Sequence, residues 1–106
     1  GEDGQAMESI LAGGQGVISV TANIAPKLMH RMCMAALAGD RAQAEECNDN
    51  IKDLHEVLFI ESNPIPTKWA LQQMGLIAAG VRLPLTPLAE QYHEAVRNAL
   101  IKADCL

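Results

Sequence analysis

Five stretches of the chain carry apolar residues at three- and four-residue steps, the spacing that places side chains on one face of an α-helix. The pattern predicts helices near residues 5–12, 25–38, 41–60, 66–74 and 87–103. The third stretch has the clearest stripe, which consists of Ala44, Cys47, Ile51, Leu54 and Leu58. We therefore expect a mainly α-helical chain whose last three helices pack together through their apolar stripes.

Residues that start and end helices lie where this pattern requires them. Asp40, with Gln43 three residues later, is similar to a capping box at the start of the third helix. Gly39 can adopt the left-handed conformation that ends many helices, so it is expected to close the second one. Thr86 is predicted to cap the last helix, with Pro87 in its first turn, because a missing N–H is tolerated there.

Gly16 to Val20 forms a continuous apolar run that only Ser19 interrupts. Such a run is typical of a parallel strand that is covered on both faces, so the segment is predicted to be extended. A strand needs neighbours for its backbone N–H and C=O groups. The sequence supplies no second convincing strand, and we therefore expect that the partners of this strand lie outside the chain.

Length, charge and cysteines narrow the class of protein. The chain has 106 residues, starts with glycine and carries a formal net charge of −5, which together suggest a processed chain or a fragment without a nucleic-acid surface. No apolar run reaches the roughly 18 residues of a membrane span, and no signal peptide is recognisable. The three cysteines are widely spaced, as expected for reduced thiols of a cytoplasmic protein.

The histidines offer little sign of a metal site. His30, His55 and His93 fall on three different predicted helices. Only His30 and Cys33, three residues apart, could share a face, and a zinc site usually needs three or four protein ligands. We interpret these residues as structural, and the sequence predicts neither a metal nor a cofactor.

The four lysines are the candidate nucleophiles of the chain, because a Schiff-base enzyme needs a lysine with a lowered pKa. Lys27, Lys52 and Lys102 stand in polar surroundings, and Lys68 beside Trp69 is the only one in an apolar context. None of them ends a predicted strand. A solvated amino group is the favoured interpretation for all four, and no catalytic residue is assigned.

Three blocks are more specific than the helices between them. They read GVISVTAN from Gly16, NPIP followed by KWA from Asn63, and RLPLTP from Arg82. In this order they resemble the C-terminal third of the dihydrodipicolinate synthase family, and the resemblance extends over essentially the whole chain. That family is part of the wider group of pyruvate-dependent class I aldolases, which includes N-acetylneuraminate lyase.

The resemblance implies an α/β fold for the parent protein, a (β/α)8 TIM barrel followed by a C-terminal helical domain. This chain would then be the mainly α C-terminal part with one barrel strand. Residues 1–39 would form the last part of the barrel, consisting of a helix, strand 8 and helix 8. Residues 40–106 would form the C-terminal helical domain.

The resemblance also implies a function. Members of the family are cytoplasmic homotetrameric lyases that condense pyruvate with L-aspartate 4-semialdehyde through a lysine Schiff base in lysine (diaminopimelate) biosynthesis. Ile18 falls where relatives place an isoleucine of the pyruvate pocket. Gly1, Glu2 and Asp3 are similar to the tip of the seventh strand, so Gly1 is more loosely a pocket residue. The family's Schiff-base lysine precedes these segments, and the isolated chain is predicted to be inactive.

Two alternatives stay open at this point. The chain could come from a related pyruvate-dependent lyase of sugar acids, or it could be a stand-alone α-helical interaction module. An isolated strand at residues 16–20 has no use in a stand-alone module, which favours a C-terminal piece of a pyruvate-dependent lyase over the module.

Two further expectations concern packing. Trp69, the only tryptophan, is expected to be anchored in the helical core or its junction with the barrel. Without the barrel, the strand at 16–20 and two apolar stripes should be exposed, so the chain is expected to self-associate or to bind its missing part. The stripes are Met7, Ile10 and Leu11 on the first helix, and Leu28, Met29 and Met32 on the second.

Overall fold

The computed structural model describes all residues from Gly1 to Leu106. The helices are α1 (Asp3–Leu11), α2 (Pro26–Leu37), α3 (Arg41–Val57), α4 (Ile65–Gln73) and α5 (His93–Lys102), with short 3₁₀ turns η1 (Thr21–Asn23) and η2 (Glu90–Tyr92). The expectation of a mainly α-helical chain is therefore confirmed. All five predicted helices are present, four of them within a few residues of their predicted bounds.

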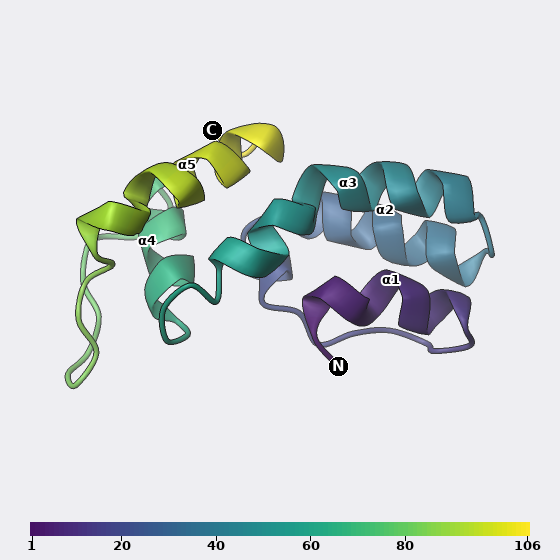
Figure 1. Cartoon of the computed structure of the whole chain (residues 1–106), viewed down its shortest axis with the longest axis horizontal. Coiled ribbons are helices and arrows are strands. Elements are labelled where there is room, and N and C mark those ends of the chain that lie inside the picture. Colours follow the sequence, from purple (N-terminus) through teal and green to yellow (C-terminus); the bar gives the residue numbers. More distant parts are fainter.

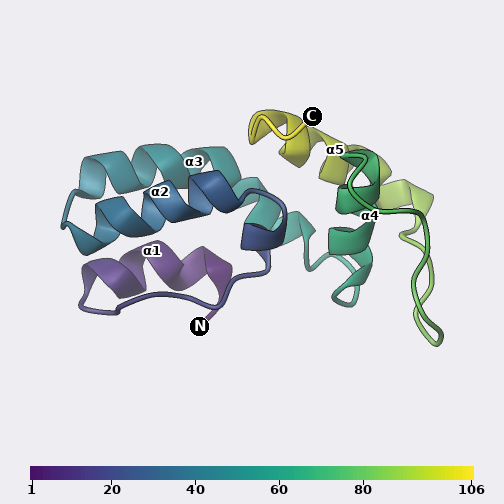
Figure 2. The same ribbon diagram turned by 180° about the vertical axis from the view of Figure 1, so that it is seen from behind.

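The helices form two groups along an elongated molecule of 41 × 25 × 22 Å. Helices α1, α2 and α3 lie side by side at one end, and α4 and α5 lie at the other (Figures 1 and 2). α3 packs mainly along α2, and α5 packs on both α3 and α4. The last three helices thus meet through α5, whereas the principal partner of α3 is α2. Packing between α2 and α3 crosses the expected boundary between residues 39 and 40, and that boundary stays a prediction.

The junction between α2 and α3 follows its sequence signals. Gly39 has a φ of 74°, in the left-handed region that glycine adopts easily. Its N–H donates to the Ala36 carbonyl at 3.0 Å, and the Asp40 N–H donates to the Ala35 carbonyl at 2.9 Å. The Asp40 carboxylate then accepts a hydrogen bond from the Gln43 N–H at 3.1 Å. The predicted glycine stop and aspartate cap are both confirmed.

The start predicted for the last helix is wrong. Thr86 caps no helix, and the chain stays non-helical until η2 leads into α5. One long-range and one local hydrogen bond explain the difference: the Ala89 N–H donates to the Glu61 carboxylate at 2.9 Å, and the His93 ring Nε2 donates to the Leu88 carbonyl, five residues earlier, at 3.0 Å. Backbone groups that a helix would use are therefore bound elsewhere.

One hydrophobic core runs through both groups of helices. It contains 16 buried residues: Ala6, Ile24, Ala25, Met29, Met32, Cys47, Ile51, Leu54, Leu58, Ile65, Ala70, Leu88, Val96, Ala99, Leu100 and Ala103. A small second cluster of Ile10, Ala36 and Ala44 closes the far end of the α1–α3 group. Every helix contributes to this interior, so the chain buries apolar surface without a barrel.

The expectation that the stripes of the first two helices would be exposed is wrong for their central residues. Ile10 and Met29 are each 3 % exposed, and Met32 is completely buried. These side chains pack within the α1–α3 group because α3 supplies a complementary apolar face. The most exposed large apolar side chains are Ile18 and, on the loop between α4 and α5, Leu76 and Leu83, while Met34 and Leu37 are exposed on the outer side of α2.

The segment predicted as a strand forms no sheet. Residues 14–19 have no regular secondary structure, and Val20 already has helical backbone angles (φ −76°, ψ −44°) as it enters η1. The segment runs back along α1 as an open trace (Figures 1 and 2). Its backbone from 15 to 19 makes no backbone hydrogen bond, because the chain holds no neighbouring strand.

A long loop at residues 74–89 joins α4 to η2 and projects away from the helices (Figure 1). Leu76 is 65 % exposed and Leu83 is 89 % exposed at this loop. The peptide bonds before Pro64 and Pro84 are cis. None of the helices has the length and apolar character that a membrane crossing requires.

Candidate functional site

The two residues assigned to a pocket lie near one another. Ile18 is on the open segment between α1 and η1, and its side chain is fully exposed. Gly1 precedes α1, and together with Gly16 and Val17 it lines a small hollow of about 70 Å³. The structure thus brings the start of the chain beside the segment that carries Ile18, and their role in a pocket stays a prediction.

Asp3 fixes the end of that segment. It is the first residue of α1, only 4 % exposed, and its Oδ2 accepts hydrogen bonds from the N–H groups of Val20 and Thr21, each at 3.0 Å. Hydrogen bonds to a charged acceptor are stronger than neutral ones. The other carboxylate oxygen of Asp3 is buried without a hydrogen-bond partner. One side chain therefore ties α1 to the point where the open segment becomes η1.

Thr21 continues this connection to α3. Its hydroxyl is completely buried and lies 2.8 Å from Nδ1 of His55, and Nε2 of the same ring lies 3.1 Å from Oδ1 of Asn48. The Asn48 oxygen can only accept, so Nε2 carries the ring proton and Nδ1 accepts from the Thr21 hydroxyl. Both ring nitrogens of His55 are satisfied when the imidazole is neutral.

The electrostatics favour that neutral form. Burial lowers the pKa of His55 below its ordinary value of 6.5, and the nearby Asp3 carboxylate only partly opposes the shift. A cation would lose hydration here and would also have to reverse the Thr21 hydrogen bond. We call the four residues Asp3, Thr21, His55 and Asn48 the His55 network.

A groove of about 610 Å³ borders the network. It is lined by Glu2, Asp3, Gly4, Asn48, Lys52, His55, Glu56 and Phe59. Polar and acidic groups predominate, with Lys52 as the single cation among them. This lining can accept hydrogen bonds and hold cationic or hydroxyl groups, but it presents no activated nucleophile beside a base.

The other chemically capable side chains are dispersed. His30 is exposed and Cys33 is half-buried on α2, and no group of three or more His, Cys, Asp or Glu side chains is placed to hold a metal ion. The three cysteines are free thiols. Burial raises the pKa of the Cys33 and Cys105 thiols, so both remain protonated at neutral pH.

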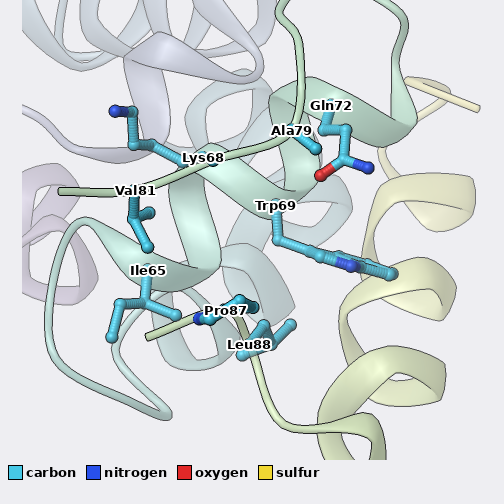
Figure 3. Close-up of a pocket in the computed structure, with 9 residues that line it drawn as sticks. Ile65, Lys68, Trp69, Gln72, Ala79, Val81, Pro87 and Leu88 are labelled. Carbon is cyan, nitrogen blue, oxygen red and sulfur yellow. The ribbon is translucent and has the colours of Figure 1, made fainter. Parts of the chain in front are cut away.

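The lysines have surface positions. Lys27 and Lys52 are exposed, and the Lys102 ammonium lies 3.1 Å from the Asp53 carboxylate. Lys68 is half-buried on α4 at the edge of a cavity of about 80 Å³. Its amino group extends away from Trp69 and Leu88 on the other side of that cavity (Figure 3).

Trp69 lines this cavity of about 80 Å³, where α4 meets two parts of the long loop, residues 79–81 and 87–88 (Figure 3). Its ring stacks on His93 with centroids 4.4 Å apart and an angle of 21°, and the Arg97 guanidinium lies 5.9 Å from its centroid. Trp69 packs against the core but is only partly buried. The expected anchoring at the helical core is present, whereas full burial is not.

Comparison with known proteins decides which family these features represent. The profile of the Dihydrodipicolinate synthetase family matches residues 1–103. The chain belongs to this family. The resemblance found in the three sequence blocks is thereby confirmed.

The dihydrodipicolinate synthase relatives match the chain closely. It is 62 % identical over 103 residues to the 4-hydroxy-tetrahydrodipicolinate synthase of Thioalkalivibrio sulfidiphilus, covering 97 % of this chain and 35 % of the relative. It is 61 % identical over 106 residues to the corresponding synthase of Methylococcus capsulatus, covering 100 % and 36 %. The chain therefore spans about a third of the length of the synthases it matches.

A solved dihydrodipicolinate synthase has the same backbone arrangement. The crystal structure of the chloride-inhibited enzyme from Acinetobacter baumannii, complexed with pyruvate, superposes with a TM-score of 0.95 at 58 % identity. The match covers 100 % of this chain and 36 % of that one. The helices described above are thus the mainly α C-terminal part of a TIM-barrel fold, as the sequence predicted.

Sequence reasoning missed the His55 network. The sequence predicts a structural role for His55 and indicates no role for Thr21 or Asn48. A signal was present: Asn48 and His55 are seven residues apart and follow Cys47 and Leu54 of the apolar stripe, so both fall beside the buried face of α3. Polar residues at that place need buried hydrogen-bond partners.

Proposed function

We propose that this chain is the C-terminal portion of a lyase that condenses pyruvate with L-aspartate 4-semialdehyde in lysine (diaminopimelate) biosynthesis. The observation that carries the proposal is the match of residues 1–103 to the family, with 62 % identity to a named synthase. The backbone similarity to a synthase crystallised with pyruvate supports the same reaction class.

The proposed chemistry starts with a lysine outside this chain. Its amine attacks the ketone of pyruvate and expels water to form a Schiff base, and the derived enamine adds to the aldehyde carbon of the second substrate. Within this chain, Ile18 supplies an apolar wall and Gly1 a narrow backbone edge of the pyruvate pocket. The full exposure of Ile18 agrees with a side chain that faces a part of the protein beyond these residues.

Borohydride trapping tests the proposal. The full-length protein, treated with pyruvate and borohydride, should gain a stable adduct on a lysine that lies outside these 106 residues. The 106-residue chain alone should gain none, because its lysines are solvated or paired with acids. An adduct on Lys68 or another lysine of this chain would contradict the assignment, as would a full-length protein that traps no pyruvate.

The sugar-acid lyase alternative receives less support, because the close relatives described above are all named 4-hydroxy-tetrahydrodipicolinate synthase. Measurement of pyruvate condensation with L-aspartate 4-semialdehyde, beside aldol cleavage of N-acetylneuraminate, separates the two. The stand-alone interaction module is favoured only by the continuous core, which lets this chain pack by itself.

The proposed synthase acts as a homotetramer in the cytoplasm. Free thiols agree with the compartment. The exposed side chains of Ile18 and Leu83 agree with surfaces that another part of the protein, or another copy, covers. Sedimentation of the full-length protein should give one tetrameric species, and a monomer under the same conditions would contradict this part of the proposal.

A further inference from the structure

The segment that carries Ile18 has few attachments of its own. Residues 15–19 take part in no backbone hydrogen bond within the chain. At its start, the Gly14 N–H donates to the Ser9 carbonyl at 2.9 Å, where a Cβ on Gly14 would clash with the same oxygen. At its end, the Asp3 carboxylate binds two successive N–H groups. Within this chain, the position of Ile18 is therefore set from these two ends.

The end at Thr21 is the more heavily connected one. Asp3 comes from α1, Thr21 from η1, and His55 and Asn48 from α3, so the His55 network joins three separate elements. Thr21 is completely buried, and His55 is 8 % exposed. A buried polar group that loses its partner is costly, so each member restricts where the others can lie.

We propose that the His55 network positions the pyruvate pocket: Thr21 and His55 are positioning residues that hold the Ile18 segment in register against α3. In this role they act through the backbone of Val20 and Thr21, to which the network is hydrogen-bonded. The proposal rests on the proposed function for the identity of the pocket. The anchoring of the segment itself follows from the geometry of this chain.

The chain contains a matched control for Thr21. Thr67 on α4 is also buried, at 5 % exposure, but its hydroxyl has no hydrogen-bond partner. Thr21→Val and Thr67→Val therefore make the same chemical change with and without the loss of a hydrogen bond. His30, which is exposed and makes no side-chain hydrogen bond, serves in the same way as a control for His55.

The first test measures amide hydrogen exchange in the 106-residue chain. Thr21→Val and His55→Leu should each speed exchange at the Val20 and Thr21 amides by at least about fivefold, the factor expected from one lost buried hydrogen bond. Amides of α5 should change less, which separates local release from global destabilisation. Thr21→Ser and His55→Gln, which keep a donor and an acceptor, should restore most of the protection, while Thr67→Val and His30→Gln should leave it unchanged.

The second test uses the full-length synthase. Thr21→Val should raise the KM for pyruvate about fivefold or more with kcat changed less than about twofold, because the lysine chemistry stays intact while the pocket wall is displaced. Thr21→Ser should restore the KM. An unchanged KM, or unchanged exchange at Val20 and Thr21, overturns the positioning role. A wild-type protein that forms no pyruvate adduct instead overturns the proposed function and leaves the exchange result to decide the anchoring.

Discussion

The two ends of the molecule each hold a histidine, and they hold it by different forces. In the α1–α3 group, His55 is buried and both of its ring nitrogens are hydrogen-bonded to side chains. In the α4–α5 group, the half-buried His93 stacks on Trp69, and a single nitrogen donates to the Leu88 carbonyl. The first ring is fixed by polar partners at defined positions, and the second mainly by contact area.

This difference separates two ways of making a small helical unit specific. Buried hydrogen bonds permit few alternative geometries, because an unpaired group in the interior is unfavourable. Stacking between aromatic rings tolerates small displacements, since its energy depends on area and offset more than on one direction. The α1–α3 group, which carries the proposed pocket segment, uses the stricter of the two.

Leu58→Ala should have the largest effect, because the two groups share one core at this point. Leu58 is fully buried at the end of α3. We expect a loss of about 3–5 kcal/mol in the free energy of unfolding. Urea unfolding followed by circular dichroism and by Trp69 fluorescence should show coincident transitions that move together. Separate transitions would mean that the groups unfold independently, and Leu76→Ala on the exposed loop is the control with a change within about 0.5 kcal/mol.

Trp69→Ala should destabilise the α4–α5 group by about 2–3 kcal/mol, below the ~3–5 kcal/mol of a fully buried aromatic residue. The ring is only partly buried, so some of its surface already meets water. Trp69→Phe should recover a large share, because it keeps an aromatic face for His93. Urea unfolding followed by circular dichroism measures both variants. Equal losses for the two would show that the indole, and not stacking, is what matters.

Thr21→Val should cost about 1–3 kcal/mol, because it leaves the His55 ring nitrogen without its donor. Thr67→Val should change the free energy of unfolding by less than about 0.5 kcal/mol, since the hydroxyl it removes has no partner. Thermal unfolding of the two variants directly compares the α1–α3 group with the α4–α5 group. Equal effects would contradict the distinction drawn between them.

Acid should weaken the α1–α3 group slightly and selectively. Because the pKa of His55 is lowered on folding, the unfolded chain binds a proton more readily below about pH 6.5. The contribution of His55 to the free energy of unfolding is therefore fully present above this pH, and it declines as the pH falls from 6.5 towards the lowered pKa of the folded state. His55→Gln should remove this component, whereas His30→Gln should retain it. The measurement covers roughly pH 5.5 to 7.5, about one unit on either side of the ordinary histidine pKa. A free energy of unfolding of the wild type that does not change over this range would contradict the buried neutral ring.

Local signals in the sequence predicted the fold well where the structure is locally determined. The stop at Gly39 and the cap at Asp40 involve residues within a few positions of one another, and both are present. Thr86 had equally suitable local chemistry and failed as a cap. There, the Ala89 N–H donates to the distant Glu61 carboxylate and His93 donates to the Leu88 carbonyl, and these hydrogen bonds outweigh the local preference.

The candidate site was predictable only in part, for the same reason. Ile18 and Gly1 came from the family resemblance, and no pattern of apolar or charged residues points to them. The bond between Thr21 and His55 joins residues 34 positions apart, so neither residue signals the other along the chain. The predicted strand forms no ladder because the chain holds no neighbouring strand for the backbone of residues 15–19.

The projecting loop between α4 and α5 has a consequence for proteolysis. Arg82 is exposed in this loop and precedes the exposed Leu83, which makes the bond between them accessible to trypsin. A single cut there would divide the chain into residues 1–82 and 83–106. The buried Val96 and Leu100 would still hold the shorter fragment in the shared core, so a nicked molecule should migrate as one particle until it is denatured.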